Sequence, residues 1–300
     1  MSFLEGDCVE LHDGSIWVVK GCHHPVNKVI ALPRLLDGYK VKRLGEALRV
    51  AYRYYRHFIH YVDFIGRYVP VIPRTLIKKH LSALRTRCSE DAGILGRLCN
   101  ELIDLLHMRC GLKCGVTGSL LYGSYSRNSD IDLVCMDTDS AYKCLMKLRK
   151  EGLLQKLSLN EFVVEYFQVS EGLDFRNHLK LVQNRVTQGR YKTRKYTLRI
   201  INPEREYLVL GPYVFERYTD MLIAKVVSSD YRTPSIYAVN VLKPNITVGR
   251  KVFIVSYRVR FTEIPENSVL LLSNALMALR IDGTVVISLD DPYTYVKILT

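Results

Sequence analysis

The 300-residue chain has no long apolar run, no Cys-x-x-Cys pair and no low-complexity tract. Its longest uncharged apolar stretch, residues 268–279, is shorter than the roughly 20 residues that a membrane-spanning helix needs. The first residues, 1–7, lack the basic and apolar regions of a secretory signal. We therefore expect a soluble, cytoplasmic protein that is not exported and has no membrane partner.

The eight cysteines lack the dense spacing of a secreted disulfide scaffold. Residues 110–114 and 22–24 contain the residue types that bind zinc, but neither group has a second ligand pair at finger-like spacing. Cysteines in a reducing compartment usually pack as small buried hydrophobic side chains. The sequence favours this interpretation over zinc binding.

The composition is basic, with 43 Lys and Arg against 30 Asp and Glu and a formal net charge of +13, so we expect an anionic partner. In several basic clusters, tyrosines alternate with Lys and Arg. This pattern is typical of surfaces on which bases stack and phosphates are neutralised. For any single cluster, a solvated surface with tyrosines facing the core is the alternative. Taken together, the clusters favour RNA or another nucleic acid. The tyrosines concerned are Tyr52, Tyr54, Tyr55, Tyr61, Tyr68, Tyr191 and Tyr196.

Hydrophobic periodicity and turn residues predict an α+β, multidomain fold with four consecutive segments. Within the second segment, the apolar spacing predicts helices over residues 44–65, 75–87 and 91–108. The four segments are a small N-terminal β module (1–40), a helical segment (41–110), a mixed α/β core (111–212) and a C-terminal β-barrel-like module (213–300).

The core segment carries residue types suited to phosphate and metal chemistry. If Asp130 and Asp132 lie in a strand, their side chains point to one face with Cα atoms about 6.5–7 Å apart. Carboxylates placed in this way can share divalent cations. Upstream, Gly118 lets the backbone approach a phosphate closely, and Ser119 can donate a hydrogen bond to it.

An apolar strand ending in Gly-Ser, a turn, and Asp-x-Asp in the next strand resembles the DNA polymerase β-like nucleotidyltransferase superfamily. Ten residues separate Gly118-Ser119 from Asp130, inside the superfamily's spacing, whereas Gly123-Ser124 leaves only five. The first pair is therefore the match. The resemblance implies a central nucleotidyltransferase-type mixed α/β sheet, with Asp130 and Asp132 as catalytic ligands of Mg²⁺ or Mn²⁺.

The expected nucleotide-binding residues are Gly118, Ser119, Arg127, Ser129 and Arg199. Arg127 either approaches a phosphate or faces water. Arg199 lies in a predicted strand, 196–201, where active members of the superfamily carry a third carboxylate. An arginine there suits phosphate binding better than general base catalysis.

Three other acids of the sequence are candidates for that third carboxylate. Glu161 and Glu165 fall in a predicted helical segment, and Asp174 follows a Gly172-Leu173 loop. We interpret Glu165 and Asp174 as solvated surface acids. The third catalytic carboxylate is therefore not identifiable in the sequence.

Most of the chain also resembles a group of archaeal proteins described as predicted nucleotidyltransferases. This resemblance implies an archaeal, cytoplasmic origin and names no substrate. The matching pieces are Glu5-Gly6-Asp7, Asp13-Gly14, His24-Pro25, Thr117-Gly-Ser-Leu-Leu, Gly189-Arg-Tyr-Lys and Val255-Ser-Tyr-Arg-Val-Arg-Phe.

Three hypotheses of function follow. The leading one is a Mg²⁺-dependent transferase that moves a nucleoside monophosphate from an NTP to a hydroxyl of RNA, protein or a small molecule. The second is a catalytically weak or inactive protein of the same fold that acts as an RNA- or DNA-binding module. The third is a regulatory partner protein whose nucleotide pocket stabilises a complex. The sequence leaves the oligomeric state open.

Overall fold

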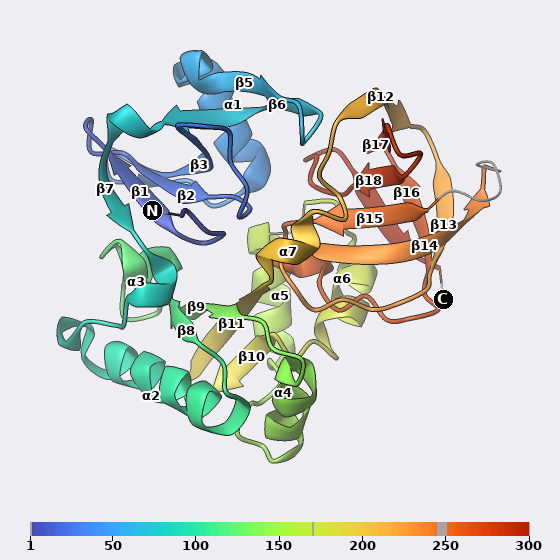
Figure 1. Cartoon of the computed structure of the whole chain (residues 1–300). Helices are drawn as coiled ribbons and strands as arrows, with labels where there is room; N and C mark the ends of the chain where they lie inside the picture. The colour runs from blue at the N-terminus through green and yellow to red at the C-terminus, as the bar shows by residue number, and fades with distance from the viewer. Residues whose placement is uncertain (1, 170, 245–250, 300) are drawn as a thin grey trace. The chain divides into compact units, whose positions relative to one another are not determined.

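The computed structural model describes residues 2–169, 171–244 and 251–299 (Figure 1). The chain divides into two compact units, each formed by three stretches. Unit 1 contains Met1–Lys42, Pro70–Leu159 and Asn184–Pro203, and unit 2 contains Arg43–Val69, Asn160–Gln183 and Glu204–Thr300. Each unit thus draws residues from three of the four consecutive segments that the sequence predicts.

Unit 1 holds an N-terminal sheet and a four-stranded sheet of order β10-β11-β9-β8. The N-terminal sheet has the strand order β7-β1-β2-β3-β6, and β4 also pairs with β3. The elements are β1 (Cys8–Leu11), β2 (Ile16–Val19), β3 (Lys28–Leu36), β4 (Tyr39–Lys40), β6 (Arg67–Pro73, which crosses from unit 2), β7 (Ile77–Leu81), α2 (Gly93–Cys110), β8 (Cys114–Val116), α3 (Gly118–Leu121), β9 (Ile131–Met136), α4 (Ala141–Lys150), β10 (Gln188–Tyr191) and β11 (Arg194–Ile201).

The Asp13-Gly14 pair, flanked by alternating apolar residues, predicts a hairpin at the N-terminus, and the structure confirms it as β1 and β2. Gly14 takes a positive φ of 83°, and the Asp13 carboxylate accepts hydrogen bonds from the Ser15 backbone and hydroxyl. These are the properties for which Asp-Gly is favoured in tight turns. Trp17 on β2 is fully buried beneath this turn, so the turn chemistry and the hydrophobic pattern fix the same register.

The four-stranded sheet forms the core of unit 1. Strand β9 is antiparallel to β8 and parallel to β11. Three successive residues of β9, Leu133, Val134 and Cys135, are buried, as expected for a central strand that is covered on both faces. Helix α2 packs against β8 and α4 (Figure 1).

One predicted helix is confirmed only in its first half, and another is wrong. Helix α1 (Leu44–Tyr54) ends well before residue 65, and Ile59–Val62 form strand β5. The predicted helix over 75–87 is instead strand β7, which pairs with β1. Pairing with a sheet edge satisfies backbone groups that local helix spacing cannot take into account, so tertiary context overrides propensity. The helix predicted over 91–108 is confirmed as α2. None of the described helices has the length and apolar character needed to cross a bilayer.

Unit 2 is built on an eight-stranded sheet that curls into a half-barrel, of order β12-β17-β18-β15-β14-β13-β16-β19. Leu173 and Leu181, beside and on α6, join its hydrophobic core. The elements are α1, β5, α5 (Leu159–Val169), α6 (Phe175–Val182), α7 (Pro203–Glu206, which begins in unit 1), β12 (Tyr213–Thr219), β13 (Leu222–Val226), β14 (Ser235–Lys243), β15 (Val252–Ser256), β16 (Val269–Ser273), β17 (Ala275–Arg280), β18 (Val285–Ser288) and β19 (Tyr295–Ile298).

The expectation that the cysteines are unbridged buried side chains is wrong for six of them. Unit 1 contains the disulfides Cys88–Cys99, Cys110–Cys144 and Cys114–Cys135. The first links the loop before α2 to α2 itself, the second links α2 to α4, and the third links β8 to β9. Cys110 and Cys114, which the zinc interpretation grouped together, are bonded to different partners.

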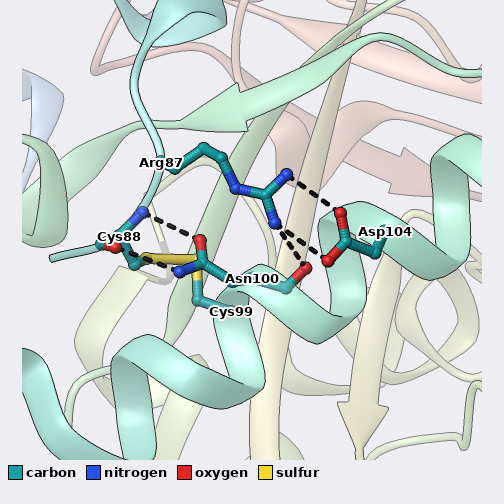
Figure 2. Close-up of a disulfide and its surroundings, with 5 residues drawn as sticks. All are labelled: Arg87, Cys88, Cys99, Asn100 and Asp104. Carbon is teal, nitrogen blue, oxygen red and sulfur yellow. Dashed lines mark hydrogen bonds and ion pairs between the residues drawn. A yellow bond between two sulfur atoms is a disulfide. The ribbon is translucent and has the colours of Figure 1, made fainter. Parts of the chain in front are cut away.

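The first of these disulfides lies in a local hydrogen-bonded frame (Figure 2). Asn100 accepts a hydrogen bond from the Cys88 backbone N–H and donates one to the Cys88 carbonyl, both at 3.0 Å. Arg87 next to it makes a two-pronged ion pair with Asp104, with both N···O distances 2.9 Å. Because this ion pair is half exposed, it adds little stability. The loop is therefore held mainly by the disulfide and by the two hydrogen bonds between Asn100 and Cys88.

The His24 imidazole gives unit 1 an expected sensitivity to acid. Burial lowers the pKa of His24 from 6.5 to about 4. The Nδ1 atom of His24 accepts from the Ile30 backbone N–H at 3.3 Å, and Nε2 lies 3.2 Å from the Phe3 carbonyl. This pattern requires the neutral ring, with a proton on Nε2 only.

Since the unfolded chain binds a proton on His24 near pH 6.5 and the folded one only near pH 4, stability falls as pH falls across this window. We expect a loss of up to about 1.4 kcal/mol per pH unit. The His24→Asn variant should have a lower free energy of unfolding than the wild type at pH 7. Its free energy of unfolding should, however, fall less when the pH is lowered. Urea unfolding at pH 7 and pH 4.5 measures both, and an unchanged pH slope in the variant would refute the assignment.

Candidate active site

The two aspartates lie at one end of β9, beside the end of β8. Asp132 is the second residue of β9, and Asp130 immediately precedes the strand. The backbone N–H of Thr117, just after β8, donates a 2.9 Å hydrogen bond to the Asp132 carbonyl. On the other side, the parallel register places Thr197 of β11 opposite Asp132.

Gly118 lies directly against the Asp132 carboxylate. A Cβ atom built on Gly118 would be 2.6 Å from Asp132 Oδ2 and 3.3 Å from its Cγ. Gly118 also takes a φ of 63°, a conformation that favours glycine. Both the backbone and the available space therefore require glycine at this position.

The rest of the turn between β8 and β9 is held by its own backbone and side chains. Ser119 lies in the short helix α3, and its carbonyl accepts from the Ser124 N–H at 3.0 Å. The Ser129 hydroxyl accepts from the Ser126 N–H at 2.9 Å, so Ser129 stabilises the turn that leads to Asp130. Arg127 is exposed.

The Asp132 carboxylate is surrounded by charges of both signs. Burial raises its pKa, and the neighbouring Asp130 carboxylate raises it further. Arg199, Arg34 and Lys195 act in the opposite direction. A cation bound at this carboxylate would favour its charged form and so oppose both effects.

Asp130 already has a cationic neighbour. Lys195 on β11 places Nζ 3.0 Å from Asp130 Oδ2, with 39% of the Asp130 side chain exposed. The partial exposure leaves room for the carboxylate to take another cation.

Arg199 is engaged with a buried acid from the N-terminus. Glu5 is fully buried, and its Oε1 lies 3.3 Å from Arg199 Nη1 and 2.9 Å from Lys20 Nζ. The other oxygen of Glu5 accepts from the Gly21 N–H at 2.8 Å. Burial lowers the pKa of Lys20, and Glu5 opposes this shift. Glu5 thus compensates the charges of Lys20 and Arg199, and Arg199 in turn acts on Asp132.

The residues after Glu5 join the N-terminal sheet to the core sheet. A Cβ on Gly6 would be 2.4 Å from Val134 Cγ2, and the Thr117 hydroxyl donates to the Gly6 carbonyl. Asp7 accepts from the Ala83 N–H at 2.7 Å. The Glu5-Gly6-Asp7 tripeptide therefore contacts the strands that carry the site.

The alternative acids considered for a third carboxylate lie in unit 2. Glu161 and Glu165 are on α5. Asp174 caps the N-terminus of α6, accepting from the Asn177 N–H at 2.8 Å and from the Tyr295 hydroxyl at 2.8 Å. Asp174 is therefore a structural capping residue, not a solvated acid.

Asp130 and Asp132 are oxygen donors of the kind that Mg²⁺ prefers. Mg²⁺ in nucleotide sites is usually held by one or two carboxylates together with substrate phosphates, and Asp130 and Asp132 supply that number. Within residues 2–169, 171–244 and 251–299, no three His, Cys, Asp or Glu side chains cluster as a potential metal site. The same finding applies to Cys22-His23-His24, where the His23 ring lies 2.8 Å from the Pro203 carbonyl.

The tyrosines of the basic clusters fall into two groups. Tyr191 and Tyr196 are buried in the core sheet, as the structural alternative for those clusters requires. Tyr55 is half-buried, and four others are exposed: Tyr52, Tyr54, Tyr61 and Tyr68. Nucleic-acid binding stays a prediction.

Sequence reasoning missed four charged residues of the site: Glu5, Lys20, Arg34 and Lys195. For Lys195 a signal was present, because it is two and four positions before Thr197 and Arg199 and therefore shares their strand face. No protein-family model and no curated protein sequence matches the chain.

Proposed function

We propose that unit 1 is a Mg²⁺- or Mn²⁺-dependent nucleotidyltransferase with a nucleotidyltransferase-type mixed α/β sheet. Its reaction moves a nucleoside monophosphate from an NTP to a hydroxyl of RNA, protein or a small molecule. Asp130 and Asp132 are the proposed metal ligands and catalytic residues. Gly118, Ser119, Arg127, Ser129 and Arg199 are the proposed nucleotide-binding residues.

The contact between Gly118 and Asp132 carries this proposal. A Cβ on Gly118 would come within 2.6 Å of the Asp132 carboxylate, so a phosphate that approaches the Gly118 backbone also meets the carboxylate. Phosphate binding at a glycine turn and cation binding at a carboxylate pair then occur on the same ligand.

The proposed chemistry is a displacement at the α-phosphorus. The acceptor oxygen forms a bond to phosphorus, the bond to the bridging oxygen breaks, and pyrophosphate leaves with the electron pair while the hydroxyl proton passes to water. A bound divalent cation supplies charge neutralisation at the phosphates. Asp130 and Asp132 hold and orient this charge, and basic side chains such as Arg34 and Lys195 lie close enough to influence Asp132.

The Gly118→Ala variant tests the carrying observation. The new methyl group would displace the Asp132 carboxylate, and we expect at least a tenfold rise in the Kd of ATP measured calorimetrically with Mg²⁺. The backbone strain of an alanine at φ 63° adds a stability loss of about 1–3 kcal/mol.

Gly123→Ala is the matched control. Gly123 has a φ of 73° in the same turn, but a Cβ there meets no atom within 4 Å. It carries similar backbone strain without touching Asp132. Equal ATP affinities of the two variants would show that the contact between Gly118 and Asp132 has no part in binding.

The second candidate function is an RNA- or DNA-binding module, or a regulatory partner, without turnover. The ion pair of Lys195 with Asp130 and that of Arg199 with Glu5 favour it, because they place cations where an active enzyme would need a third acid. Such a module would bind RNA in a strongly salt-dependent manner without Mg²⁺, which filter binding at several salt concentrations measures.

A cytoplasmic location in an archaeon is part of the proposal. Disulfides are rare in most cytosolic proteins, but intracellular proteins of hyperthermophilic archaea are rich in them. The three disulfides of unit 1 are therefore compatible with this location in such an organism.

A further inference from the structure

Strand β11 presents basic side chains on the sheet face that carries the two aspartates. Thr197 is opposite Asp132 in the parallel register. Because residues two positions apart on a strand share a face, Lys195 and Arg199 lie on the same face as Thr197. The neighbouring strand of the site therefore contributes positive charge, not a carboxylate.

The two basic residues have different partners. Arg199 is 3.3 Å from Glu5, an acid that is fully buried. Lys195 is 3.0 Å from Asp130 Oδ2, and about a quarter of its side chain is exposed. Lys195 thus neutralises one of the two proposed metal ligands directly.

This pairing limits how many cations the site can hold. Two divalent ions would bring four positive charges to a face where two carboxylates already meet the Lys195 ammonium. Like charges a few Å apart repel strongly in a partly buried site. Within the chain's described residues, no three His, Cys, Asp or Glu side chains cluster in a way that could hold a metal ion, so the aspartate pair gains no third protein ligand for a second cation.

We propose that Lys195 is a built-in counter-ion of Asp130 that excludes a second divalent cation, so that the aspartate pair takes up one metal ion with its nucleotide. This inference rests on the proposed function. Lys195 acts through Asp130 and is a positioning residue, because its ammonium sets the charge available for metal at the carboxylate.

The test counts Mn²⁺ ions bound per chain from the electron paramagnetic resonance signal of free Mn²⁺, with a saturating non-hydrolysable ATP analogue. We expect one ion for the wild type and for Lys195→Arg, which keeps the charge. Lys195→Met keeps the length of the side chain without its charge and should bind two. Lys192→Met is the matched control, because Lys192 precedes the same strand and pairs with Glu101, 2.5 Å away; it should bind one.

Each outcome separates the two proposals. A wild-type count of two overturns the role of Lys195 and leaves the proposed function standing, even if Lys195→Met does not fold. A wild-type chain that binds neither analogue nor Mn²⁺ removes the proposed function itself. A count of one in folded Lys195→Met, or of two in Lys195→Arg, overturns the counter-ion assignment.

Discussion

Reduction of the three disulfides is expected to lower the thermal midpoint of unit 1 by about 15–30 °C. The bonds close loops with sequence separations of 11, 21 and 34 residues. In the chain-entropy description, each such loop stabilises the fold by about 3–4 kcal/mol. Thermal unfolding followed by circular dichroism, with and without a phosphine reductant, measures the shift.

The three contributions are not expected to add fully. The Cys114–Cys135 loop is nested inside the Cys110–Cys144 loop, so closing one already restricts the other. A combined loss of about 6–8 kcal/mol is comparable with the whole stability of many domains. Replacing one cysteine pair at a time with serine should divide this loss, with Cys88–Cys99 contributing least because its loop is shortest.

A thiol count under denaturing conditions provides the control. Cys8 and Cys22 are the two cysteines outside the disulfides, so the oxidised chain should show two reactive thiols and the reduced chain eight. Cys22→Ser should leave the effect of the reductant unchanged. Eight reactive thiols before reduction, or a midpoint that the reductant does not move, would exclude these bonds from the native protein.

The sequence predicted features whose determinants are local. The Asp13-Gly14 turn and the flanking apolar alternation are enough to place β1 and β2. The expected proximity of Gly118 and Asp132 depends on one strand-turn-strand segment, and the structure brings the two residues together. In both places a short stretch of chain contains all the interacting residues.

The features that sequence reasoning missed depend on contacts between distant residues. Glu5 meets Arg199, 194 positions away, only because the segment before β1 packs against β9, with Gly6 next to Val134. Strand β7 forms because the edge of β1 accepts it. A disulfide requires Cα atoms closer than about 7 Å, and the spacing of cysteines along a chain does not contain this distance.

Asp130→Asn and Asp132→Asn are each expected to reduce transfer of an α-phosphate label from NTP at least a thousandfold. An amide is similar in shape to a carboxylate but lacks its charge, so the change removes metal binding while the fold is kept. Asp132 should be the more sensitive position, since it lies directly against Gly118. Label incorporation with Mg²⁺ and mixed acceptors measures the loss.

Asp139→Asn is the matched control for charge, because Asp139 is an exposed acid just beyond the same strand. It should label at the wild-type rate. RNA affinity at low salt should change little in any of the three variants, since contacts from Lys and Arg to phosphates supply it.

These two readouts separate the candidate functions. An enzyme loses labelling in both site variants and keeps RNA affinity. A binding module shows no Mg²⁺-dependent labelling in the wild type and the same salt-dependent RNA affinity in every variant. Undiminished labelling in the Asp130→Asn, Asp132→Asn double variant would show that the active site does not depend on these two residues. A transfer that depends on this carboxylate pair could not survive the removal of both charges.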